Sequence, residues 1–209
     1  TREGGKRLLI NAGSSNPRIC FTTVAKENPM QAPMFCMLLR KHLTGALLCS
    51  VEQLEFERTV KLTFLTRDEM GFECKRHLIA EVMGKYSNLI FADENMKIIA
   101  ALKPVDFTTS SLRQVLPGMK YELPPAQNKK DPRNTSKEEF LSLASLFPSE
   151  KSAEKFITSS YLGISTAVAR EISQRASGRF DISLSECDID LLYDQFTEIF
   201  EIMQSGEFE

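Results

Sequence analysis

Alternating apolar and polar positions predict strands in the first part of the chain. Residues 58–64 place Val60, Leu62 and Phe64 on one side and polar residues on the other, which is typical of a half-buried strand. Its polar side, with Thr59 and Thr63, is therefore expected to face solvent. The other expected strands are 7–12 and 18–23, which form a hairpin across a Gly-Ser-Ser-Asn-Pro turn, then about 78–83, and a second hairpin of 88–92 and 97–102.

Helical spacing governs one early segment and the whole last part of the chain. A helix is expected from Pro33 to Leu43, because proline suits the first turn of a helix and Gly45 stands just past the end. Residues 117–135 are rich in Pro, Gly, Asn and Lys, as linkers are. Ser136 and Glu139 then have the spacing of a capping box. The expected helices beyond the linker are 136–147, 150–160, 165–178 and a last one from 185 onward.

These elements predict an α+β protein with two domains. A strand-rich domain is expected over residues 1–133 and a small all-α domain over residues 134–209. The first range holds 20 Lys+Arg against 14 Asp+Glu, and the second holds 6 against 14. The balances of +6 and −8 direct any polyanion to the first domain, although ordinary solvated surface fits them equally well.

The residues that usually build catalytic or metal sites are scarce. The five cysteines are scattered with no two separated by two residues, which favours thiols in a reducing cytosol over disulfides or a zinc site. Only two histidines are present. We therefore expect no catalytic residues, no metal and no cofactor. No apolar run is long enough to cross a membrane. The chain begins at Thr1 without methionine and reads as part of a longer protein.

Two helical features suit phosphate groups. Gly163, Ile164 and Ser165 lie in a short turn between two expected helices, where backbone amides at a helix start can bind phosphate. A plain pair of helices fits that turn equally well. The basic run of Arg40, Lys41 and His42 ends the early helix. It is a candidate RNA contact, but complementing the helix dipole is the slightly favoured role.

Two strand ends are further candidates for RNA contact. Glu57 and Arg58 precede an expected strand, where arginine can grip phosphate with two hydrogen bonds, although the spacing alone favours a surface ion pair. A second stretch lies between two expected strands and mixes a cation, the aromatic face of Tyr86 and hydrogen-bonding side chains. That mixture suits unpaired RNA, although an ordinary polar turn is the favoured interpretation. Its candidate residues are Glu81, Lys85, Ser87 and Asn88.

In combination, several stretches resemble the NFACT/RqcH family, which includes RqcH in bacteria and NEMF in animals. The matching stretches are Pro33–Leu43, Gln53 with Glu57 and Arg58, Glu81–Gly84 with Ser87 and Asn88, Leu116–Gly118, Tyr121–Lys129, and the helical region of about 136–205. Glu57 stands where the family usually has aspartate, which keeps the charge and lengthens the reach by one methylene.

The resemblance implies a function in ribosome-associated quality control. Members of this family bind large ribosomal subunits obstructed by peptidyl-tRNA, recruit charged tRNA, mainly alanyl-tRNA, and promote C-terminal tailing of the stalled chain. Peptide-bond formation stays with the ribosome, so no enzyme is expected, and the location is cytoplasmic and ribosome-associated. The pair Glu57 and Arg58 matches the family's tRNA-handling pair.

The resemblance also implies a fold and an alternative function. The family's first domain is similar to the N-terminal domain of formamidopyrimidine-DNA glycosylases and precedes a helix-hairpin-helix domain. Those enzymes use an N-terminal proline, whereas Thr1 stands here, so glycosylase activity is not expected. Bacterial members also carry the name fibronectin-binding protein A (FbpA), which suggests a surface adhesin for fibronectin or fibrinogen. An opening segment with an Asp-Gly element, a coiled coil and a C-terminal domain are expected outside these 209 residues.

Overall fold

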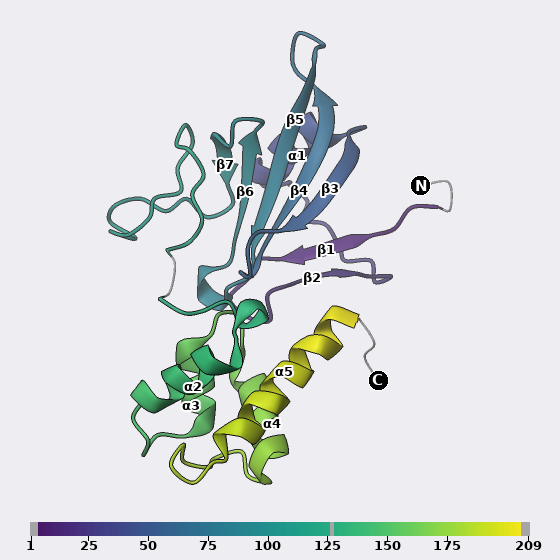
Figure 1. Ribbon diagram of the computed structural model, residues 1–209. Helices are drawn as coiled ribbons and strands as arrows, with labels where there is room; N and C mark the ends of the chain where they lie inside the picture. Colours follow the sequence, from purple (N-terminus) through teal and green to yellow (C-terminus); the bar gives the residue numbers. More distant parts are fainter. Residues whose placement is uncertain (1–3, 126–127, 206–209) are drawn as a thin grey trace. The chain divides into compact units, whose positions relative to one another are not determined.

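A computed structural model describes residues 4–125 and 128–205 (Figure 1). The chain divides after Pro125 into two compact units, at a point inside the Pro- and Gly-rich stretch 117–135. The first unit is built on a sheet and the second on helices, so the α+β class is confirmed.

An antiparallel sheet of five strands forms the centre of the first unit. Strands that follow one another along the chain are neighbours in the sheet, because each connection is short. The first strand was not expected, since its sequence does not alternate regularly and its pairing is irregular between Leu48 and Ser50. The strands in spatial order are β3 (Leu47–Gln53), β4 (Thr59–Arg67), β5 (Glu73–Glu81), β6 (Asn88–Asp93) and β7 (Ile98–Ala101).

Both faces of the sheet's centre are covered. On one face, the segment after β7 folds back through the antiparallel bridge between Val105 and Val115. The core residues on this side are Ile79, Ile90, Ala92, Ile98, Val115 and Tyr121. On the other face lies α1 (Met34–Leu43), whose His42 ring is 5.6 Å from the ring of buried Phe91.

The expectation that Thr59 and Thr63 face solvent is therefore wrong. Their exposed fractions are 0% and 7%. Thr63 Oγ1 lies 3.1 Å from Nδ1 of His77, its partner across the two strands. Alternation in the sequence shows which residues share a face, but it does not show whether a second layer covers the polar one.

The expected first hairpin is confirmed. Strands β1 (Leu8–Asn11) and β2 (Arg18–Phe21) pair antiparallel. Lys103 connects this hairpin to the large sheet, because its Nζ donates to the carbonyl oxygens of Ala12 at 2.7 Å and Ser87 at 2.9 Å. These two hydrogen bonds fix the hairpin beside the start of β6.

The four expected helices of the second unit are confirmed, with shifted boundaries. Two begin later than expected. The helix expected from about residue 150 is capped by Ser152, and the helix expected from residue 185 follows Asp188. Phe140 is fully buried and its ring centroid lies 5.2 Å from that of Phe156. The helices are α2 (Lys137–Leu146), α3 (Ala153–Ser160), α4 (Thr166–Ser177) and α5 (Ile189–Ser205).

The expected capping box at the start of α2 forms only in part. Ser136 Oγ accepts a hydrogen bond from the backbone N–H of Glu139 at 3.2 Å. The Glu139 carboxylate, however, binds Nζ of Lys130 at 2.7 Å instead of reaching back to the first residue of the box. The ion pair ties the preceding loop to the helix.

Candidate nucleic-acid interface

Strand register brings two of the predicted RNA-binding stretches to one end of the large sheet. Thr59, at the start of β4, is paired with Glu81 at the end of β5, which is paired with Asn88 at the start of β6. The pairing extends one step further, because the N–H of Val82 donates to the carbonyl oxygen of Arg58 at 2.8 Å. The loop before β4 and the turn between β5 and β6 therefore lie next to each other.

The loop before β4 presents Arg58 to solvent. Two hydrogen bonds hold this loop. Gln53 Nε2 donates to the carbonyl oxygen of Glu57 at 2.9 Å, and the N–H of Leu54 donates to the carbonyl oxygen of Thr59 at 2.9 Å. Arg58 is exposed and Glu57 is half-buried. Within the described residues, neither side chain forms an ion pair, so the surface pair that the spacing favoured is not formed. The guanidinium is left available to a phosphate.

The turn between β5 and β6 presents Lys85. A short 3-10 helix (Gly84–Tyr86) forms this turn, and Gly84 adopts φ +59, a value that glycine adopts without strain. Ser87 Oγ accepts a hydrogen bond from the N–H of Met83 at 2.8 Å and closes the turn. Lys85 is exposed, with its Nζ 4.8 Å from the centroid of the Tyr86 ring.

The other predicted residues of this turn are committed inside the fold. Ser87 and Asn88 are buried, and the Asn88 side chain both donates to the carbonyl oxygen of Lys103 at 2.7 Å and accepts from its N–H at 2.9 Å. Glu81 is 3% exposed. These three side chains therefore hold the turn in place, and Arg58 and Lys85 are the predicted residues that stand exposed at this end of the sheet.

The charge of Glu81 is balanced by a residue that the sequence reasoning missed. Arg113 Nη2 lies 2.6 Å from Oε1 of Glu81, and the Tyr121 hydroxyl donates to the same oxygen at 2.9 Å. Burial, followed by the nearby carboxylate, raises the pKa of Tyr121, so its hydroxyl remains a donor. Arg113 lies in an irregular loop with no periodicity, so its pairing had no signal in the sequence.

The basic run of α1 does not join this group. Thr66, near the far end of β4, donates through Oγ1 to the carbonyl oxygen of His42 at 2.8 Å. Seven residues of strand separate Thr66 from Thr59, which is about 23 Å. Lys41 pairs with Glu69 at 2.7 Å, and Arg40 accepts the capping N–H of the helix end through its carbonyl oxygen. Burial lowers the pKa of His42, with help from neighbouring cations.

The turn that was predicted to bind phosphate lies between α3 and α4 of the second unit. Gly163 adopts φ +70 between α3 and α4, and Ser165 caps α4 by accepting from the N–H of Val168 at 3.2 Å. The first amides of a helix have no partner within it, so those of Thr166 and Ala167 remain available at this turn. Ile164 is half-buried beside them. A plain pair of helices would share all of these features.

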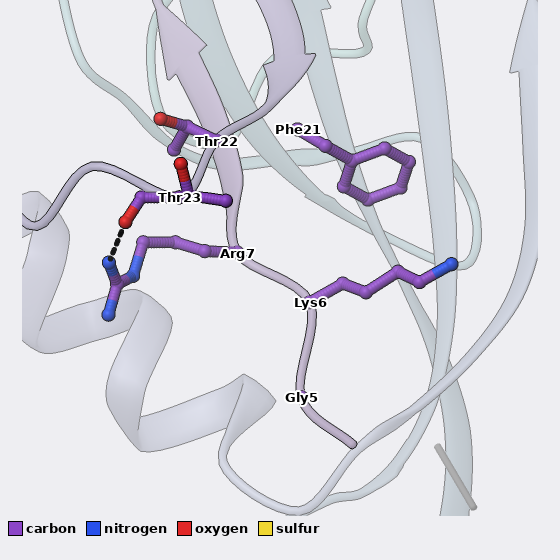
Figure 2. Close-up of a pocket in the computed structure, with 6 residues that line it drawn as sticks. All are labelled: Gly5, Lys6, Arg7, Phe21, Thr22 and Thr23. Atoms are coloured by element: carbon purple, nitrogen blue, oxygen red, sulfur yellow. Dashed lines mark hydrogen bonds between the residues drawn. The ribbon is translucent and has the colours of Figure 1, made fainter. Parts of the chain in front are cut away.

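A shallow hollow lies at the open end of the β1–β2 hairpin, which the sequence reasoning did not single out. Figure 2 shows Arg7 turned towards Thr23, whose carbonyl oxygen accepts from Nη1 at 3.4 Å. Lys6 lies beside the exposed ring of Phe21, with Nζ 5.8 Å from its centroid. The lining residues are Gly5, Lys6, Arg7, Phe21, Thr22 and Thr23.

Metal-binding and membrane-spanning features are missing from the part of the chain that the structure describes. In residues 4–125 and 128–205, no three His, Cys, Asp or Glu side chains gather in a way that would hold a metal ion. None of the helices in those ranges combines the length and the apolar character needed to cross a membrane.

Comparison with known proteins gives one consistent set of relatives. The family of NFACT N-terminal and middle domains matches residues 1–209. The chain is 40% identical over 173 residues to "Rqc2 homolog RqcH" of Bacillus subtilis, covering 82% of this chain and 30% of the relative. It is 33% identical over 205 residues to "Archaeal Rqc2 homolog aRqcH" of Methanocaldococcus jannaschii, covering 95% and 29%. The chain thus spans less than a third of the length of these relatives.

Solved structures agree with this result. The N-terminal part of the fibronectin/fibrinogen-binding protein from Streptococcus suis is similar with a TM-score of 0.78 and 30% identity, covering 96% of this chain and 70% of that one. The fibrinogen-binding protein from Staphylococcus aureus is similar with a TM-score of 0.75 and 29% identity, covering 94% and 65%.

Proposed function

This chain belongs to the NFACT/RqcH family, and from that premise we propose that it is the RNA-binding part of a ribosome quality-control factor. In this proposal, the protein binds tRNA, alanyl-tRNA above all, and large ribosomal subunits obstructed by peptidyl-tRNA. It promotes C-terminal alanine tailing of the stalled chain. It catalyses no step itself, because the ribosome forms the peptide bonds, and it acts in the cytoplasm on ribosomes.

The free guanidinium of Arg58 is the observation that carries this proposal. It is exposed at a sheet end, without an ion-pair partner among the described residues, and next to the turn that presents Lys85. A planar guanidinium can donate two parallel hydrogen bonds to a phosphate, and a lysine nearby adds a second positive charge. Two cations on neighbouring loops suit the closely spaced phosphates of folded RNA.

An arginine substitution tests the proposal in the full-length protein. Arg58→Ala is expected to weaken tRNA binding at least about tenfold, because a charge-assisted contact is lost. The salt dependence of binding should fall by about one unit of slope, as one phosphate contact disappears. Arg67→Ala is the matched control, since Arg67 is an exposed arginine at the opposite end of the same strand.

The measurements are tRNA affinity, copurification with large subunits and the length of C-terminal tails. Unchanged values for Arg58→Ala would remove Arg58 from the interface. A parent protein that copurifies with neither tRNA nor large subunits would overturn the proposed function as a whole.

A second function is favoured by the names of two solved relatives, a fibronectin/fibrinogen-binding protein and a fibrinogen-binding protein. A surface adhesin predicts the intact protein on washed cells, binding to immobilised fibronectin, and absence from ribosome fractions. The quality-control function predicts the opposite distribution. Cell fractionation followed by immunodetection of the protein separates the two.

A further inference from the structure

The ring of Tyr86 stands in water beside the proposed RNA contacts. Of the four tyrosines, all of which lie in the described residues, Tyr86 is exposed by 71%, Tyr121 and Tyr161 are buried, and Tyr193 is half-buried. A ring exposed to this extent contributes little to the packing of the fold. It can offer an apolar, flat surface to a partner.

The backbone under this ring is held firmly. The N–H of Tyr86 donates to the carbonyl oxygen of Met83 at 3.1 Å, and the N–H of Ser87 donates to that of Gly84 at 3.0 Å. Lys103 Nζ then binds the Ser87 carbonyl oxygen at 2.9 Å and ties the turn to the first hairpin. A side chain on such a turn loses little freedom when a partner covers it, which favours binding.

The charges around the ring suit a nucleotide. The Lys85 ammonium lies 4.8 Å from the ring centroid, and Arg58 occupies the adjoining loop across β5. Aromatic rings bind bases by stacking, while neighbouring cations bind the phosphates on either side of the base. Bases inside a paired helix are covered by their neighbours, so the ring can stack on an unpaired base but not on a base within a helix.

We propose that Tyr86 is a stacking platform for an unpaired base of the RNA whose phosphates bind Arg58 and Lys85. This inference rests on the proposed function and names the class of RNA that the site selects: a loop, a bulge or a single-stranded end. The ring contributes by area and flatness, so its hydroxyl is not required. Lys85 acts on the adjoining phosphate and contributes to the salt dependence.

Two RNA probes of equal phosphate number test the platform in the full-length protein: a stem with an unpaired loop, and a blunt duplex. Tyr86→Ala is expected to weaken binding of the looped RNA between about 5-fold and about 100-fold. The salt slope and the affinity for the duplex should stay unchanged. Tyr86→Phe should bind the loop like the parent. Phe72→Ala is the matched control, because Phe72 is an exposed aromatic residue in the turn between β4 and β5.

A direct readout comes from Tyr86→Trp, measured as the difference in fluorescence between the full-length variant and the full-length parent, because these 209 residues contain no other tryptophan. The looped RNA should quench the added fluorescence, and the duplex should not. If the parent binds the looped RNA but Tyr86→Ala binds it equally well, the platform is refuted while the proposed function stands. If the parent binds tRNA but not the looped RNA, the platform is refuted and the proposed function stands. If the parent binds neither tRNA nor large subunits, the proposed function fails and the platform fails with it. Equal losses for Tyr86→Ala on loop and duplex would also refute stacking on an unpaired base.

Discussion

Replacing Arg113 by leucine should destabilise the first unit severely. The Arg113 side chain is 12% exposed and pairs at 2.6 Å with Glu81, which is 3% exposed. The substitution would leave a carboxylate buried beside the apolar core. Among residues 4–125 and 128–205, only the Tyr121 hydroxyl would then remain as a hydrogen-bond donor to it. A buried charge without its counter-charge is among the costliest defects a fold can carry.

The magnitude follows from the geometry of the pair. Removing one partner of a buried ion pair costs about 3–5 kcal/mol. The guanidinium also lies 5.1 Å from the centroid of the Tyr121 ring, a contact that contributes about 0.5–1 kcal/mol. Two features reduce the loss: Tyr121 still donates to Glu81, and Arg113 Nε is a buried donor without an acceptor among the described residues. We therefore expect a loss of about 3 kcal/mol in the free energy of unfolding.

Urea unfolding of the full-length protein gives the free energy, and hydrogen exchange of the β5 amides assigns it to the first unit. Glu81→Gln removes the buried carboxylate that Arg113→Leu would leave without its counter-charge. The loss in the free energy of unfolding caused by Arg113→Leu should therefore be at least about 1.5 kcal/mol smaller in the Glu81→Gln background than in the parent. Arg67→Leu is the surface control and should change stability by less than about 0.5 kcal/mol. The reasoning would be refuted by an Arg113→Leu loss no larger than that control, or by equal losses in the two backgrounds.

Two further predictions concern a buried histidine and a helix cap. Burial, followed by the charge of Lys61, lowers the pKa of His77 from its ordinary 6.5. As the pH falls below 6.5, His77 of the unfolded chain gains a proton first, while the ring in the folded protein stays neutral. The contribution of the neutral His77 ring to stability is therefore complete above pH 6.5 and is lost as the pH falls below that value. Ring resonances that titrate at or above pH 6.5 in a nuclear magnetic resonance titration would contradict this. Ser165→Ala removes the acceptor for the N–H of Val168 and should cost about 1 kcal/mol, seen as faster hydrogen exchange in the first turn of α4; unchanged exchange there would count against the cap.

Local features of the sequence predicted most of the helices and hairpins. Ser165 and Gly178 at the two ends of α4 are found as the cap residues that their types indicated, because capping depends on the few residues around a helix end. The hairpins β1–β2 and β6–β7 followed from apolar runs on either side of turn residues. Strand β3 was missed, because its irregular pairing erases the alternation by which strands are recognised.

The candidate site was likewise predicted from the sequence only in part. The sequence by itself determined which residue types were on offer: Arg58 and Lys85 with their polar neighbours, each in its own short stretch. Only the tertiary structure decided that these stretches share one sheet end, since strand register is a relation between residues distant in the chain. It also buried Glu81 against Arg113, 32 positions away, and left Tyr86 in water. Burial and charge pairing depend on which segment packs over which face, and no local pattern encodes that choice.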